Sequence, residues 1–176
     1  GAADDVLLER CLAPALADAV RDLADEAGAP TVDQLGPRRG AVDWSIVVPL
    51  YRSLELLPAQ FAAFAADPDM ARSELVLVLD SPEQEDELRR ALHGLDLVYG
   101  LPVTLVVNGR NLGYAGAVNA GARAARGRWL VPCNSDVIPA SPGWLSALRR
   151  SLLPGIGATG PLLLFPDDTI QHAGMY

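Results

Sequence analysis

The stretch Trp129-Leu130-Val131-Pro132-Cys133-Asn134-Ser135-Asp136 joins a hydrophobic run to a polar triplet. The run predicts a buried strand, and the triplet then places oxygen atoms where that strand leaves the sheet. Open α/β sheets bind ligands at this carboxyl edge. Carboxylate and carbonyl oxygens suit hard cations such as Mg2+ or Mn2+, which in turn bind phosphate. Asn, Ser and Asp are also ordinary turn residues, so the surrounding sequence has to decide between a site and a turn.

Three further hydrophobic runs precede this one and are separated by segments with helical periodicity. Near-continuous apolar strands that alternate with amphipathic helices indicate an α/β fold, a mostly parallel sheet with helices on both faces. Ser81-Pro82, within a capping box, and Ser141-Pro142 are expected to start two of the helices. We expect one more strand at 158–165 and a turn at 166–169. The main strands are predicted at 45–49, 75–79, 103–107 and 129–133, and the helical apolar faces at 57–64, 88–95, 113–126 and 145–152.

Each predicted parallel strand ends in a polar loop. Because the carboxyl ends of parallel strands meet at the same edge of a sheet, these loops are expected to form one site. The four loops are Tyr51-Arg52-Ser53, Asp80-Ser81, residues 108–111 and residues 134–136.

The region before the first of these strands differs in character. Residues 4–27 have helical spacing of leucines and valine, and residues 29–43 have the Pro and Gly content of a linker. We therefore expect 1–40 to form an N-terminal helical segment with a linker, and 41–176 to form the α/β domain. The N-terminal helices would cap the domain, connect it to a preceding module or mediate a homodimer, and the sequence does not choose among these.

Composition limits the kinds of partner. The net charge of −8 argues against non-specific binding to nucleic acid or to an anionic membrane. An acidic chain that binds an anion needs a local device, such as a metal ion, a helix N-terminus or a few placed arginines. The two cysteines, Cys11 and Cys133, form no metal-binding pattern and fit a reducing compartment, with Cys133 as a small core residue.

A glycine-rich stretch lies between the third strand and the following helix. Asn111-Leu112-Gly113-Tyr114-Ala115-Gly116-Ala117-Val118-Asn119-Ala120-Gly121 contains small residues that either let a ligand approach the backbone or let a helix pack tightly on a sheet. It is neither GxGxxG nor a Walker A motif. Tyr114 and Trp129 are expected to be packing residues.

In order and spacing, these motifs resemble those of family 2 glycosyltransferases. The resemblance covers residues 44–176 and implies the glycosyltransferase A fold, which binds nucleotide diphosphate sugars. The tail, Gly157-x-x-Gly160-Pro161 through His172-Ala173-Gly174, resembles a bacterial branch of rhamnosyl- and galactofuranosyltransferase-like proteins. The matching motifs run from residues 45–51 and 78–80 through Asn111-x-Gly113-x-x-Gly116-x-x-Asn119-x-Gly121 to Asn134-x-Asp136.

The resemblance implies a role for each matching residue. Tyr51 would stack on the nucleobase, or is a half-buried loop aromatic. Asp80 would bind the base or ribose, or is a helix N-terminal charge beside Ser81. Asp136 would hold Mg2+ or Mn2+, although Asn134-Ser135-Asp136 has one carboxylate fewer than the Asp-x-Asp of many relatives. The nucleotide-sugar site would comprise Pro49, Tyr51, Asp80, Asn111, Gly113, Gly116, Asn119 and Asn134.

The implied activity is inverting transfer of a sugar from a nucleotide diphosphate sugar to a glycan or lipid-linked acceptor, as in the synthesis of cell-envelope polysaccharides. The catalytic base is expected beyond Tyr176, in the part that supplies the acceptor site; His172 is a candidate within the chain, and Asp167 and Asp168 read as a turn. Such a protein would be cytoplasmic, or peripheral at the inner face of the membrane. Two alternatives remain: a nucleotide-sugar-binding module without catalysis, and an interaction domain with a vestigial pocket.

Overall fold

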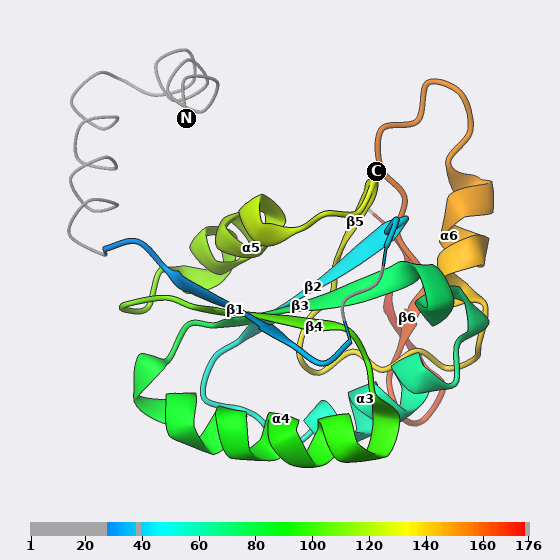
Figure 1. The fold of residues 1–176 in the computed structure, drawn as a ribbon. Coiled ribbons are helices and arrows are strands. Elements are labelled where there is room, and N and C mark those ends of the chain that lie inside the picture. Colours follow the sequence, from blue (N-terminus) through cyan, green and yellow to red (C-terminus); the bar gives the residue numbers. More distant parts are fainter. Residues whose placement is uncertain (1–27, 38–39, 175–176) are drawn as a thin grey trace.

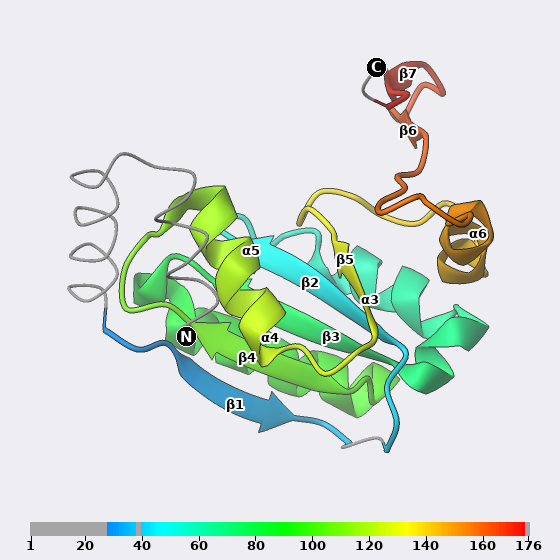
Figure 2. The ribbon, with the colours of Figure 1, turned by 90° about the horizontal axis from the view of Figure 1, so that it is seen from above.

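A five-stranded sheet forms the centre of the computed structural model, which describes residues 28–37 and 40–174. The strands lie in the order β1-β4-β3-β2-β5 (Figure 2). β2, β3, β4 and β5 are parallel, and β1 runs antiparallel to β4. The strand bounds are β1 Thr31–Leu35, β2 Trp44–Leu50, β3 Ser73–Leu79, β4 Val103–Val107 and β5 Trp129–Pro132.

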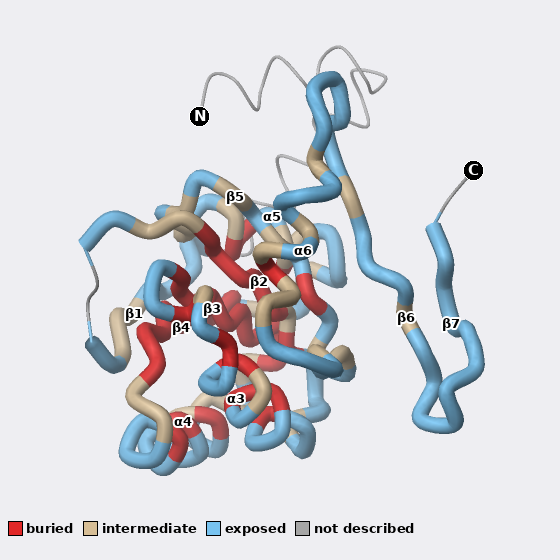
Figure 3. The backbone as a smooth tube through the Cα atoms, turned by 90° about the vertical axis from the view of Figure 1, so that its right-hand side faces the viewer, coloured by how far each residue is buried: buried red, intermediate tan, exposed pale blue. Residues whose placement is uncertain are grey.

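Helices cover both faces of this sheet, which confirms the predicted α/β class. α3 (Leu57–Ala65) and α4 (Glu85–Tyr99) lie on one face, and α5 (Gly113–Ala124) lies on the other (Figure 1). Because successive strand residues point to opposite faces, β2 supplies Ile46, Val48 and Leu50 to the α3–α4 side and Val47 to the α5 side. Buried residues therefore concentrate in the sheet and on the helix faces turned toward it (Figure 3).

The segment expected to be a linker contains β1, so that prediction is wrong. Asp33 lies opposite Leu105 of β4, and Gln34 Nε2 donates to the Val103 carbonyl at 2.8 Å. Asp33 also forms an ion pair with Arg89 of α4. An edge strand needs only one ladder partner and can be polar on its open side, so its sequence lacks the hydrophobic run of a central strand. The predicted helix at 4–27 lies outside the described residues.

Two helix starts differ from the prediction. The Ser81 side chain does not cap the helix that follows it. Its Oγ donates to Gln84 Oε1 and accepts from the Arg52 backbone amide in the preceding loop. The short 3-10 turn Pro82–Gln84 comes before α4. The last helix, α6 (Trp144–Ser151), begins after Gly143, whose φ of +82° ends the preceding loop. A second 3-10 turn, Pro68–Arg72, connects α3 to β3.

The C-terminal segment lies apart from the sheet (Figure 2). Of the strand expected at 158–165, only β6 (Leu163–Leu164) forms, and it pairs with β7 (Ile170–His172). The predicted turn between them is confirmed by a 2.8 Å hydrogen bond from the Phe165 amide to the Thr169 carbonyl. Within the described ranges, no helix has both the length and the apolar character needed to cross a membrane.

Candidate functional site

A cavity of about 550 Å³ opens at the carboxyl edge of the sheet. Each of the four loops that were predicted to meet there contributes at least one lining residue. Asn108, in the third loop, is buried and donates to Asp80. The structure brings seven predicted site residues together as lining: Pro49, Tyr51, Asp80, Asn111, Gly113, Asn134 and Asp136. These residues therefore meet at the predicted edge of the sheet, and their role in binding a nucleotide sugar stays a prediction.

Asp80 organises the floor of this cavity. Its side chain is almost fully buried at the end of β3, and Oδ1 accepts from Asn108 Nδ2 at 2.8 Å and from the Leu112 amide at 2.9 Å. Oδ2 accepts from the Gly113 amide at 2.9 Å. Asp80 thus caps the N-terminus of α5, not the helix beside Ser81, because the β4–α5 loop folds back over the end of β3.

Two residues of the glycine-rich stretch lie elsewhere than predicted. Neither Gly116 nor Asn119 lines the cavity. A Cβ on Gly116 would lie 2.6 Å from the Leu112 side chain, so this glycine serves packing within the start of the helix. Asn119 is exposed on α5. Gly121 likewise serves packing, because a Cβ there would lie 2.4 Å from Val47 and 2.7 Å from Val78.

The turn after β5 holds Asp136 at the cavity. The Val137 amide donates to the Asn134 carbonyl at 3.1 Å, which closes the turn around Ser135 and Asp136. Beneath it, Cys133 is buried in the core, as predicted. Burial, with a smaller contribution from the negative charge of Asp136, raises the pKa of the Cys133 thiol to about 12.

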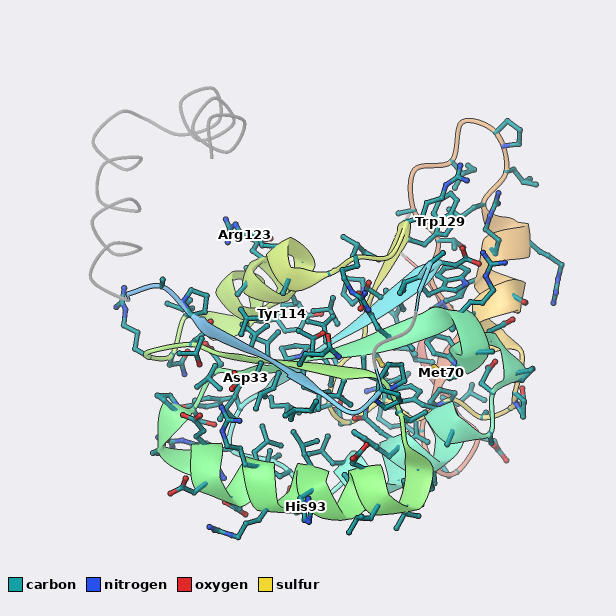
Figure 4. The ribbon with its side chains drawn as sticks, in the orientation of Figure 1. Asp33, Met70, His93, Tyr114, Arg123 and Trp129 are labelled. Atoms are coloured by element: carbon teal, nitrogen blue, oxygen red, sulfur yellow. The ribbon has the colours of Figure 1, made fainter. Side chains whose placement is uncertain are left out.

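Three further polar or aromatic residues line the cavity: Ser53, Tyr114 and Ser135. Ser53 and Ser135 belong to loops that were expected at the site, although no role was assigned to them, whereas Tyr114 was not expected there. Tyr114 was expected to be a packing residue, yet this residue is 58% exposed at the first turn of α5 (Figure 4). Tyr51 is 46% exposed, and Arg52 lies 5.1 Å from the centre of its ring. The signal for Tyr114 was its position directly after the loop glycine, where α5 begins at the ligand edge.

Neither described histidine lies in the cavity. His172 is exposed on β7, and His93 is exposed on the outer face of α4 (Figure 4). Asp167 Oδ1 accepts from the amide and the hydroxyl of Thr169, which lowers the pKa of its carboxyl group and confirms the turn interpretation.

Comparison with known proteins agrees with this architecture. Residues 45–153 match the family model described as "Glycosyl transferase family 2". The chain belongs to this family. The resemblance inferred from the motifs is therefore confirmed, and the match includes every residue that lines the cavity.

Two curated relatives cover most of the chain. An uncharacterized protein of Sinorhizobium fredii, y4gI, is 29% identical over 144 residues, which is 80% of this chain and 15% of that protein. The O-antigen biosynthesis protein RfbC of Myxococcus xanthus is 28% identical over 145 residues, which is 79% of this chain and 11% of that protein. The chain thus spans a small part of the length of both relatives.

Two solved structures share the fold of this family 2 domain. The mannosyltransferase PcManGT from Pyrobaculum calidifontis, solved with GDP-Man and Mn2+, has a TM-score of 0.57 and 21% identity, over 64% of this chain and 33% of that one. Residues 1–349 of S. aureus TarS give a TM-score of 0.50 and 18% identity, over 63% and 32% of the two chains. These similarities confirm the predicted fold.

The side-chain oxygen atoms at the cavity fit a divalent cation whose remaining coordination positions are filled by the phosphates of a bound ligand. Asp136 presents a carboxylate, flanked by the side chains of Asn134 and Ser135. Among residues 28–37 and 40–174 there is no cluster of three or more His, Cys, Asp or Glu side chains arranged to hold a metal. Mg2+ commonly binds through one or two carboxylates together with substrate phosphates. The donor set of this family 2 domain matches that pattern, and not that of a metal site formed by protein alone.

Proposed function

We propose that this family 2 domain binds a nucleotide diphosphate sugar at the cavity, and that the whole protein transfers the sugar with inversion. The observation that carries the proposal is the meeting of Tyr51, Asp80, Asn111 and Asp136 from four separate loops at the carboxyl edge. The volume of the cavity, about 550 Å³, lies within the range of small-molecule sites.

The charges at the cavity support a role for a divalent cation. Among the residues that the structure describes, its lining includes two carboxylates, those of Asp80 and Asp136, and no Arg, Lys or His side chain. The first two amides at the α5 N-terminus are already bonded to Asp80, whose own negative charge opposes an anion there. A diphosphate would therefore be repelled unless a cation came with it. Asp136 is the exposed carboxylate available to hold Mg2+ or Mn2+.

In the proposed reaction, the acceptor hydroxyl attacks the anomeric carbon from the side opposite the diphosphate. A bound divalent cation would supply Lewis-acid stabilisation of the charge that grows on the leaving group. Asp136 would hold that cation, and the rings of Tyr51 and Tyr114 offer surfaces on which a base can stack. The base that takes the proton of the acceptor hydroxyl is proposed to lie in another part of the whole protein.

The acceptor is proposed to be a glycan or lipid-linked glycan, and the transfer to serve cell-envelope polysaccharide synthesis. RfbC, named for O-antigen biosynthesis, supports this proposal. The protein would then act in the cytoplasm, at the inner face of the membrane when the acceptor is a lipid.

Isothermal titration calorimetry tests donor binding. The protein is titrated with UDP, GDP and dTDP, each with and without Mn2+. We expect one nucleotide to bind at least tenfold more tightly with Mn2+, and Asp136→Asn to remove this gain. Asp86→Asn, an exposed change on α4, serves as the matched control. Absence of binding by all three nucleotides with Mn2+ present would refute the proposal.

Measurement of sugar release separates an enzyme from a binding module. In the part of the chain that the structure describes, Asp136 is the one lining carboxylate without a protein hydrogen bond, because Asp80 already accepts from two amides; this observation favours a module that binds without catalysis. Hydrolysis or transfer from the nucleotide sugar that binds would exclude the module. Binding without turnover by the whole protein would exclude the enzyme.

A further inference from the structure

Gln60 lies in α3 among apolar residues, yet its side chain reaches the turn that carries Asp136. Its neighbours on the buried face of α3 are Leu57, Phe61 and Phe64. Gln60 is fully buried, and Nε2 donates to the Asn134 carbonyl at 2.9 Å and to the Val137 carbonyl at 2.8 Å. One amide group thus holds both ends of the turn.

Cys133 adds a second buried donor to the same two carbonyls. Its Sγ lies 3.6 Å from the Asn134 oxygen and 3.8 Å from the Val137 oxygen. The raised pKa of this thiol keeps it protonated, so that it donates. Two side chains that are far apart in the sequence therefore converge on the backbone of one four-residue turn.

The side-chain oxygen of Gln60 indicates that a contribution to stability does not by itself account for a glutamine at this buried position. Oε1 is buried and has no hydrogen-bond partner among the described residues. A buried acceptor without a partner lowers stability, whereas an apolar residue of similar volume would match the rest of this helix face. Reversing the amide would place Oε1 against two carbonyl oxygens, so the Nε2 assignment follows from the geometry.

We propose that Gln60 is a positioning residue that fixes the Asn134–Val137 turn and thereby holds the Asp136 carboxylate at the cavity. The role of Asp136 rests on the proposed function, whereas the hold on the turn is a property of the fold. Gln60 does not line the cavity and would not touch the ligand. Its effect would pass through the two backbone carbonyls.

Alkylation of Cys133 reports on the turn without any ligand. In a Cys11→Ser background, iodoacetamide modification of Cys133 is followed at pH 8 in folded protein. We expect Gln60→Met to speed modification at least tenfold, because the turn above the thiol loses its main tie. Leu92→Ala, which removes buried volume from α4, controls for general loss of stability. Equal rates in Gln60→Met and the parent, or equal acceleration by Leu92→Ala at a matched loss of Tm, would overturn the proposal.

Ligand affinity tests the consequence for the cavity. We expect Gln60→Met to weaken binding of the nucleoside diphosphate with Mn2+ about tenfold and Leu92→Ala to leave it unchanged. Should Gln60→Met not fold, Gln60→Leu, which also removes the amide without burying a charge, replaces it in both measurements. Unchanged affinity in a variant with a loosened turn would overturn the positioning role. If the parent protein binds no nucleotide, the proposed function fails, but the thiol measurement still decides whether Gln60 holds the turn.

Discussion

The Gly113 amide donates to Asp80 Oδ2 at 2.9 Å and so joins the start of α5 to the end of β3. The carboxylate accepts two more hydrogen bonds, from Asn108 and from the Leu112 amide. Asp80, at the edge of the sheet where the cavity opens, therefore also holds the loop between β4 and α5 in place.

Replacing Asp80 should affect both stability and binding. Asp80→Asn removes the charge and turns an amide hydrogen toward at least one of the three donors. We expect the free energy of unfolding in urea to fall by about 2 kcal/mol, because bonds to charged groups are each worth about 1.5–3 kcal/mol. Nucleotide affinity should fall with it.

The matched change Asp86→Asn, on the exposed side of α4, should alter stability by less than about 0.5 kcal/mol. If both variants unfold at the same urea concentration, the bonds of Asp80 do not hold the β4–α5 loop.

Two glycines in helices should respond to alanine in opposite directions. Gly121→Ala brings Cβ to 2.4 Å from Val47 and should destabilise the protein by about 1–3 kcal/mol, the usual range for overpacking. Gly94→Ala on α4 meets nothing within 4 Å and should stabilise it by about 0.5–1 kcal/mol through helix propensity. Thermal unfolding followed by circular dichroism compares the two. A stabilising Gly121→Ala would show that α5 does not pack against the sheet as closely as described.

An ion pair between buried Glu74 and partly exposed Arg126 lies at the opposite edge of the sheet, where β3 begins. Glu74, fully buried, accepts from Ser45 Oγ at 2.6 Å and from Arg126 Nε at 2.8 Å. The side chain of Arg126 is 35% exposed, so solvent screens part of the attraction. Glu74→Ala should lower the free energy of unfolding by about 3 kcal/mol, because it leaves Arg126 and Ser45 without their shared acceptor. Glu55→Ala, at an exposed position, is the control and should change stability little; similar losses in both variants would contradict this account.

The thiol of Cys133 predicts how stability depends on alkaline pH. Its pKa is raised from 9.0 to about 12 in the folded protein, mainly by burial. Above pH 9 the unfolded chain releases a proton that the folded chain keeps. The contribution of the protonated Cys133 thiol to the free energy of unfolding is therefore fully present below pH 9. It is lost as the pH rises toward 12, by about 1.4 kcal/mol per pH unit.

Cys133→Ala should lack this slope. Urea unfolding of both proteins between pH 8 and 11 gives the difference, which removes contributions from other groups. Parallel pH profiles would mean that Cys133 titrates normally in the folded state.

The parallel strands, the helices between them and the edge where their polar loops gather could all be predicted from the sequence. These features follow from hydrophobic periodicity, which is a local property: Ile46 and Val48 face α3 while Val47 faces α5 because the strand alternates. The family motifs pointed to residues of these loops, and most of those residues line the cavity.

Only the tertiary structure decided which of these residues hold one another. Asp80 meets an amide 33 residues away, and Gln60 meets a carbonyl 74 residues away. The polar strand β1 joins the sheet only because β4 offers it an edge. Such partners leave no periodic pattern in the sequence, since a hydrogen bond between distant residues is specified by how the helices pack on the sheet and not by the residues beside it. Local sequence patterns therefore specify the strands and helices, whereas the packing of helices on the sheet determines the shape of the site.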